Sequence, residues 1–108
     1  EQVIEPVVRA ESFIAPEHLK VIRDAMRRTV TAGSASSMQL VPVAVAGKTG
    51  TAEWSSTGAP HSWFVGFAPY ERPEIAIAVL VEEGGGDGST AVPIAREILT
   101  WYFTHRSQ

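Results

Sequence analysis

The sequence predicts an α+β fold in which an antiparallel three-stranded sheet is packed by helices. Apolar residues recur at three- and four-residue spacing over residues 16–32 and 89–105, as in amphipathic helices. Between them, stretches at about 43–54, 61–68 and 74–82 are rich in β-branched, aromatic, Gly or Thr residues. Short turns join these three stretches, which favours an antiparallel meander.

The first helix is predicted over residues 16–32. Pro16 suits the first turn, and Glu17 lies near the positive end of the helix dipole. One apolar face follows from the spacing of Leu19, Ile22, Ala25, Met26 and Val30. Gly33 can end the helix, and the small, polar residues 34–38 predict a flexible loop.

The strand region leads into the second helix. The run Ile75–Val81 is almost continuously apolar, which predicts a strand buried on both faces. Gly84–Gly88 interrupts the chain, and Ser89 can cap the last helix.

Composition excludes several classes of function. The chain of 108 residues carries a formal net charge of −3 and has no basic run longer than Arg27-Arg28, so nucleic-acid binding is not expected. It contains no cysteine, His18 and His105 have no ligand-spaced partner, and His61 is interpreted as a solvated turn residue, so neither a metal nor another cofactor is expected. Its apolar runs are too short to span a membrane. The start at Glu1, without Met or a leader, is interpreted as a cut inside a longer chain.

The segment Gly47–Thr51 (Gly-Lys-Thr-Gly-Thr) admits two chemical interpretations. Gly47-Lys48-Thr49 matches the end of a phosphate-binding P-loop, but the first glycine of that pattern would fall at Pro42. A P-loop also leads into a helix, whereas Thr and Gly here favour a strand. The better match is the Lys-Thr-Gly element of serine acyl-transferases that recognise penicillin.

A strand at the lip of a cleft would give each residue of this element a task. Lys48 would supply a positive charge for a substrate carboxylate and a proton-shuttling hydroxyl. Thr49 and Thr51 point the same way in a strand and could offer two hydroxyls to one anion. Gly50 would let a substrate backbone pair closely with the strand, and the Thr51 N–H would stabilise an oxyanion.

Four segments occur in the order typical of one family: A-P-E-H-L-K-V-I-R-D-A-M-R-R-T-V-T-A-G, V-A-G-K-T-G-T-A-E, H-S-W-F-V-G-F-A-P and E-I-A-I-A-V-L-V-E-E-G-G-G. Over residues 10–105 the chain resembles the C-terminal part of the transpeptidase domain of class B penicillin-binding proteins, closest to the elongation type. The resemblance implies a penicillin-binding/serine β-lactamase-like fold, with residues 1–108 forming the C-terminal portion.

The resemblance also implies a function for the parent protein. It would be a peptidoglycan D,D-transpeptidase that cross-links stem peptides through an acyl-serine and is acylated by β-lactam antibiotics. Lys48 and Thr51 would be catalytic, with the Thr51 N–H in the oxyanion hole; Thr49, Gly50 and Thr51 would bind substrate. The enzyme would work at the extracytoplasmic face of the bacterial membrane, anchored by an N-terminal segment absent from this chain.

The chain departs from the family pattern in two motifs. Glu17 and Val45 stand three residues before its two lysines, Lys20 and Lys48, so it has no Ser-x-x-Lys. It has no asparagine, so it has no Ser-x-Asn either. We therefore expect the chain alone to lack transpeptidase activity, because a nucleophile and its base act as a unit. Without the missing half, Ile75–Val81 should form an exposed edge through which the chain associates, either with itself or with its missing segment.

Three alternatives remain open on sequence grounds. One is a fragment of a class D β-lactamase or β-lactam sensor, which shares a Lys-Thr-Gly strand. Another is a non-catalytic assembly module that keeps the sheet for partner contacts. The third is the P-loop nucleotidase.

Overall fold

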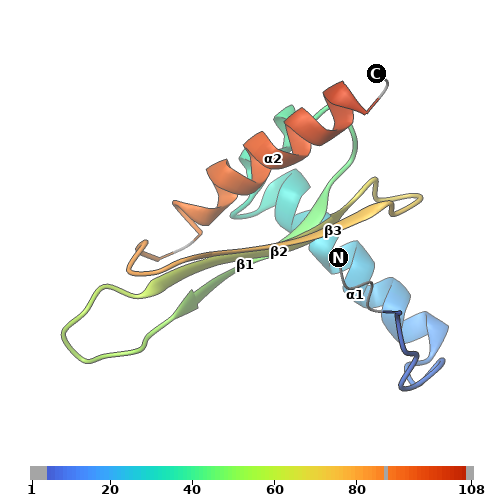
Figure 1. Ribbon diagram of the computed structural model, residues 1–108, viewed down its shortest axis with the longest axis horizontal. Helices are drawn as coiled ribbons and strands as arrows, with labels where there is room; N and C mark the ends of the chain where they lie inside the picture. The colour runs from blue at the N-terminus through green and yellow to red at the C-terminus, as the bar shows by residue number, and fades with distance from the viewer. Residues whose placement is uncertain (1–4, 87, 107–108) are drawn as a thin grey trace.

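The computed structural model describes residues 5–86 and 88–106 and contains one antiparallel sheet with helices on it (Figure 1). The elements are α1 (Pro16–Ala32), the short 3₁₀ helix η1 (Ser36–Leu40), β1 (Ala46–Ala52), β2 (His61–Ala68), β3 (Ile75–Val81) and α2 (Ala91–His105). The strand order is β1-β2-β3, so β1 and β3 are the two edges of this sheet. The predicted α+β fold is confirmed.

The strand register divides the sheet into two faces. Residues paired across the three strands share a face, and the next set along points the other way. We call one side the α2 face, marked by Thr49, Phe64 and Val79, and the other the open face, marked by Lys48, Val65 and Ala78.

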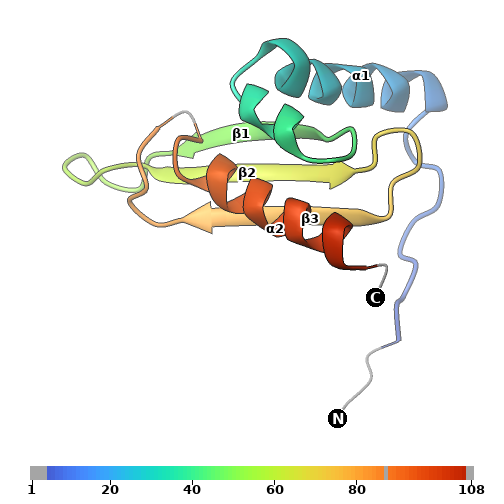
Figure 2. The same cartoon turned by 90° about the horizontal axis from the view of Figure 1, so that it is seen from above.

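The core lies between α2 and the α2 face (Figure 2). Its fully buried side chains include Met38, Phe64, Ala95 and Leu99. Helix α2 begins at Ala91, two residues later than predicted, and Ser89 does not act as the cap. The Thr90 hydroxyl instead donates to the Gly84 carbonyl at 2.9 Å, and the Ala91 N–H donates to Ser62 Oγ at 3.3 Å. A side chain from β2 thus satisfies an end-of-helix donor.

The prediction of a flexible loop over residues 34–38 is wrong in part. It ends in η1, and both Ala35 and Met38 are fully buried. Two apolar side chains three residues apart lie on the same side of a 3₁₀ turn, which explains why this short polar stretch folds onto the core.

Helix α1 has the predicted bounds but packs by only part of its apolar face. All of its residues are described, and Val30 is the one that is buried, whereas Leu19 and Ile22 are 42% and 50% exposed. Two guanidinium groups hold the helix to the sheet: Arg23 donates to the Tyr70 carbonyl and Arg27 to the Val45 carbonyl, each at 2.7 Å. Figure 2 shows α1 lying beside β1.

Strand β3 is not buried on both faces as predicted. Its odd-numbered residues are half-buried against the core, while Ala76, Ala78 and Leu80 are exposed on the open face. The apolar run reflects an edge strand whose outward face has no helix over it among the described residues. Strand β1 is also shorter than predicted, because the carbonyls of Ala44 and Val45 bond to Tyr70 N–H and Arg27 rather than to β2.

Candidate functional site: the Lys-Thr-Gly strand

The Gly47–Thr51 segment lies within β1 and is extended along its whole length. Its neighbour in the sheet is β2 on one side, and the other side is a sheet edge. A P-loop would require a helix to begin here, with its N-terminus facing a phosphate. The strand therefore rules out the P-loop interpretation.

Lys48 stands on the open face, beside α1. Its side chain is exposed and borders a depression of about 450 Å³ that is otherwise lined by Ile22, Ala25, Met26, Thr29 and Val65. The ammonium Nζ donates to the backbone carbonyl of Thr49 at 2.5 Å. An ammonium has three donors, so this bond leaves further hydrogen-bonding capacity at the mouth of the depression.

Thr49 and Thr51 stand on the α2 face, under the Gly-rich turn that precedes α2. Thr49 is only 7% exposed, and its Oγ1 lies 2.7 Å from the hydroxyl of Ser34. A methyl group at Gly88 would fall 2.8 Å from Thr49 Cγ2, and one at Gly86 would fall 3.8 Å from Thr51 Oγ1. The turn thus lies directly against both threonine side chains.

The two glycines of the motif meet different surroundings. A methyl group at Gly47 would fall 2.4 Å from the Phe64 ring, inside the core. One at Gly50 would fall 3.1 Å from Trp63 Cβ on the open face. Gly47 is therefore required for packing, whereas Gly50 keeps an accessible stretch of strand without a side chain.

The four predicted site residues thus separate by face. Lys48 and Gly50 belong to the open face, and Thr49 and Thr51 belong to the α2 face, as strand alternation dictates. The two groups approach each other only around the outer edge of β1. An extended peptide bound along this edge would lie between the Lys48 ammonium and the hydroxyls of Thr49 and Thr51.

Sequence reasoning missed two residues that support this strand. Ser34 falls in the predicted flexible loop, yet its hydroxyl contacts Thr49. Arg27 enters the sequence analysis only as part of the short basic run Arg27-Arg28, yet it bonds the carbonyl of Val45, immediately before β1. Both contacts join positions more than a dozen residues apart, and no local pattern signals them.

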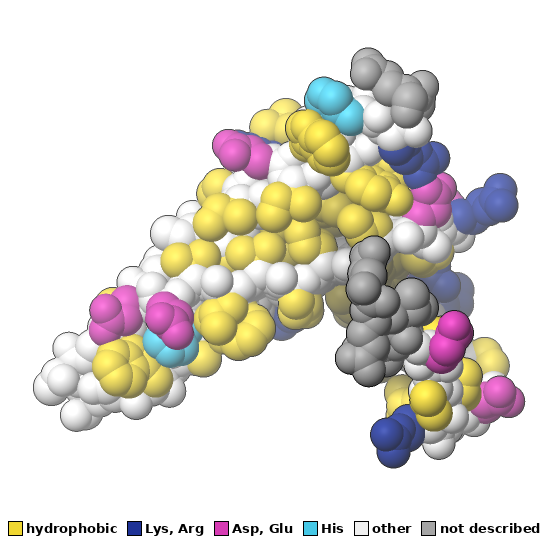
Figure 3. Space-filling model, viewed as in Figure 1, with side chains coloured by type: hydrophobic (Ala, Val, Ile, Leu, Met, Phe, Trp, Pro, Cys, Tyr) yellow, Lys and Arg dark blue, Asp and Glu magenta, His cyan; other side chains and the backbone are white. Residues whose placement is uncertain are grey.

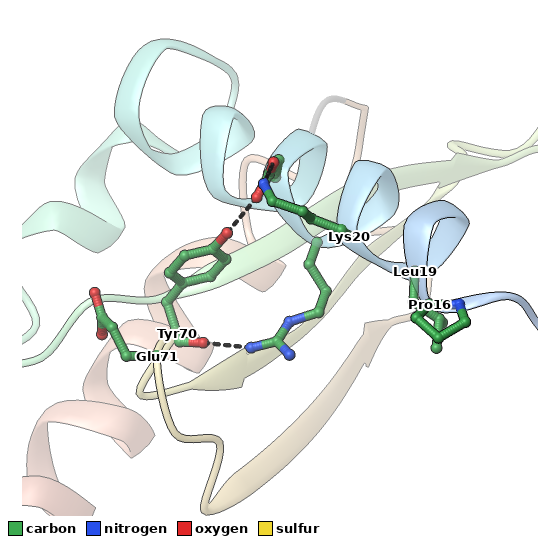
Figure 4. A pocket seen from close by; sticks show the side chains of 7 residues that line it. Pro16, Leu19, Lys20, Tyr70 and Glu71 are labelled. Atoms are coloured by element: carbon green, nitrogen blue, oxygen red, sulfur yellow. Dashed lines mark hydrogen bonds and ion pairs between the residues drawn. The ribbon is translucent and has the colours of Figure 1, made fainter. Parts of the chain in front are cut away.

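A second depression, of about 520 Å³, lies at the other end of α1 and is lined in part by Tyr70 and Glu71 (Figure 4). Asp24 accepts hydrogen bonds from Lys20 and from the Tyr70 hydroxyl. The bonds from Lys20 and then Tyr70 hold the pKa of Asp24 below its ordinary value, while bonding to Asp24 raises the pKa of both partners. These polar groups are occupied with one another, so we interpret the cluster as a fastening of α1 to the β2–β3 turn.

Among the residues that the structure describes, neither a metal-binding group of side chains nor a membrane-spanning helix is found. Over residues 5–86 and 88–106, no group of His, Asp or Glu side chains could hold a metal ion. No helix within these ranges is long and apolar enough to cross a bilayer.

Comparison with known proteins shows the family of this chain. Residues 3–100 match the family described as the penicillin binding protein transpeptidase domain. The peptidoglycan D,D-transpeptidase MrdA of Haemophilus influenzae is 34% identical over 76 residues, which cover 57% of this chain and 12% of that protein. The chain therefore spans about an eighth of the length of this curated relative.

Solved structures agree. PBP2 of Pseudomonas aeruginosa, in complex with WCK 5153, superposes with a TM-score of 0.75 and 28% identity, over 94% of this chain and 21% of that chain. Penicillin-binding protein A of M. tuberculosis, as an imipenem acyl-enzyme, superposes with a TM-score of 0.62 and 30% identity, over 79% of this chain and 20% of that chain. The chain belongs to the penicillin-binding protein transpeptidase domain family, and it is a piece of a class B transpeptidase domain.

Proposed function

We propose that this chain forms one wall of the active site of a peptidoglycan D,D-transpeptidase, and that the rest of the enzyme supplies the nucleophile. The observation that carries the proposal is the extended Gly47–Thr51 strand at a sheet edge, with Lys48 at the mouth of a depression. The relatives named as D,D-transpeptidases and the imipenem acyl-enzyme of M. tuberculosis penicillin-binding protein A support it.

The wall would act mainly by electrostatics and positioning. A stem peptide or β-lactam laid along the outer edge of β1 would pair with the strand beside Gly50, where no side chain intervenes. The Lys48 ammonium would turn from the Thr49 carbonyl toward a hydroxyl of the missing half and the substrate carboxylate. Thr49 and Thr51 would bind that carboxylate from the other face, and the Thr51 N–H would stabilise the oxyanion.

The two lysines allow a matched test in the whole protein that contains this segment. We expect Lys48→Ala to slow acylation by benzylpenicillin by about a hundredfold or more, the effect of removing one preorganised group that stabilises transition-state charge. Lys20→Ala should leave the rate unchanged, because Lys20 bonds Asp24 on the exposed surface of α1. Equal rates for both variants and the wild type, with unchanged melting temperatures, would refute the assignment.

The chain of 108 residues should not be acylated by itself. It lacks Ser-x-x-Lys and Ser-x-Asn, so a hydroxyl activated by a neighbouring base is missing. Intact-mass spectrometry after incubation with benzylpenicillin should show the unmodified mass. A covalent adduct at one serine would contradict this expectation and would require a different nucleophile.

The chain alone should self-associate through the edge of β3. Figure 3 shows hydrophobic side chains gathered over one side of the molecule, and exposed apolar residues of β3 and α2 include Leu80, Ile94 and Ile98. An unpaired apolar edge is a template for further strand pairing. Light scattering should show a mass that rises with concentration, and Ala78→Lys should reduce this rise while Ala10→Lys should not. A concentration-independent monomer would contradict the proposal.

The proposed transpeptidase function implies where in the cell this segment would act. Peptidoglycan is cross-linked outside the cytoplasmic membrane, so the segment would work at the extracytoplasmic face, held there by an anchor elsewhere in the protein. Protease accessibility of the parent protein in spheroplasts would test this.

A further inference from the structure

We infer that Ser34 is a positioning residue of the active-site wall, which aims the hydroxyl proton of Thr49 at the carboxylate of the substrate. The inference rests on the proposed function and adds a residue to it. It starts from the 2.7 Å contact between Ser34 Oγ and Thr49 Oγ1.

Thr49 is held in a single side-chain orientation by two contacts. Its methyl group lies against Gly88, where an added methyl would fall 2.8 Å from Cγ2, and its hydroxyl lies on Ser34. A β-branched side chain has few χ1 choices, so fixing the methyl also fixes the oxygen. Gly88 has φ +67°, a conformation that favours glycine, and its lack of a side chain lets the turn approach Thr49 this closely.

Ser34 is itself fixed by rigid structure. It follows Gly33, the C-terminal cap of α1, and precedes Ala35, which is fully buried and donates its N–H to the Thr29 carbonyl at 3.1 Å. The same helix is joined to the start of β1 by the bond from Arg27 to the Val45 carbonyl. Ser34 therefore keeps its place relative to Thr49 through the backbone rather than through its own side chain.

The donors and acceptors of the two hydroxyls determine which way the hydroxyl hydrogen of Thr49 must point. A hydroxyl has one hydrogen to donate and two lone pairs to accept with. If Thr49 donated to Ser34, it would have no hydrogen left for an anion. When a carboxylate is bound, Ser34 must donate to Thr49 Oγ1, and Thr49 must donate to the carboxylate. In such a series of hydrogen bonds each hydroxyl polarises the next, which strengthens the bond to the anion.

The test uses acylation of the whole protein by benzylpenicillin and by its methyl ester, which lacks the anionic carboxylate. Ser34→Ala should slow acylation by benzylpenicillin by roughly fivefold to tenfold, the scale of one hydrogen bond to a charged group. Acylation by the ester should change by less than about twofold, since the ester presents no carboxylate charge. Ser34→Thr keeps the hydroxyl and should restore the rate with benzylpenicillin, and Ser36→Ala is the matched exposed control.

A Thr49→Val background separates the possible outcomes. There, Ser34→Ala should have no further effect, because the residue through which it acts has lost its hydroxyl. The inference is overturned if Ser34→Ala reacts with benzylpenicillin like the wild type, slows both compounds equally, or still slows acylation in the Thr49→Val background. If Lys48→Ala is nevertheless impaired, the proposed function stands and only the role of Ser34 is lost.

Discussion

The α2 face and the open face of the sheet differ sharply in how completely they are packed. On the α2 face, Phe64 and Thr49 are almost wholly buried under α2 and the Gly-rich turn. On the open face, Val65 and Leu80 are 40% and 44% exposed, and α1 covers only the part near β1. Like β2 and β3, strand β1 contributes to both faces: Thr49 belongs to the packed side and Lys48 to the unpacked side.

This difference separates support from access in the candidate site. The α2 face carries the packed core, which supports β1 and encloses the Thr49 side chain. The open face leaves apolar side chains and the Lys48 ammonium in contact with solvent, which agrees with the proposal that a further part of the domain and a substrate meet here. Substitutions on the two faces should therefore have different consequences.

The largest expected difference is between two leucines. Leu99→Ala removes a fully buried side chain of α2 and should lower the free energy of unfolding by about 2–5 kcal/mol. Leu80→Ala is the same substitution on the open face, at a residue already 44% exposed, and should cost about 1 kcal/mol or less. Urea denaturation of both variants measures this, and similar losses would mean that the open face is covered in solution, for example by self-association.

The two glycines of the motif sharpen the comparison. Gly47→Ala places a methyl group against the Phe64 ring and should destabilise the fold by about 1–3 kcal/mol. Gly50→Ala would bring a methyl group 3.1 Å from Trp63 Cβ, a tight contact that a shift of a few tenths of an ångström relieves, and should change stability by less than about 1 kcal/mol. In the whole protein, however, Gly50→Ala should slow β-lactam acylation. A variant at Gly50 that is unstable but fully active would reverse the assignment of roles.

The connection between α1 and β1 should have an intermediate effect. Arg27→Ala removes a 2.7 Å bond to the Val45 carbonyl and should cost about 1 kcal/mol in unfolding free energy. Arg28→Ala, its exposed neighbour, is the matched control and should be close to neutral. Faster amide hydrogen exchange in β1 of the Arg27 variant alone would show that the bond steadies the strand.

The smallest effect is expected from pH at the Asp24 cluster. Because the pKa of Asp24 is lowered, its contribution to stability is present above its unfolded pKa and is lost as pH falls through its folded pKa. The pKa values of Lys20 and Tyr70 are raised, so their contributions are present below their unfolded pKa values and are lost as pH rises through the folded ones. Lys20 is exposed, and Asp24 and Tyr70 are only half-buried, so the change should be slight and weakened by salt. Side-chain NMR titration with Asp24→Asn as reference checks the directions.

Much of the fold could be predicted because the spacing of apolar residues along the chain indicates helices and strands locally. The spacing from Leu19 to Val30 located α1 correctly, and the Gly-Lys-Thr-Gly-Thr composition indicated a strand rather than a P-loop helix. Burial was harder to predict. Ile75–Val81 is apolar at every position, so its pattern could not show which of its faces α2 would cover. Met38 lies in a stretch whose composition predicts a loop, yet its side chain is fully buried in the core.

The sequence by itself determined the family, the order of the elements and the alternation that sends Lys48 one way and Thr49 the other, because these depend on residue types and on the two-residue period of a strand. Only the tertiary structure decided that Ser34 meets Thr49, that Arg27 bonds the start of β1, and that one face is packed while the other is open. Such contacts join residues distant in the chain, and they form only when the sheet and its helices close on a shared core.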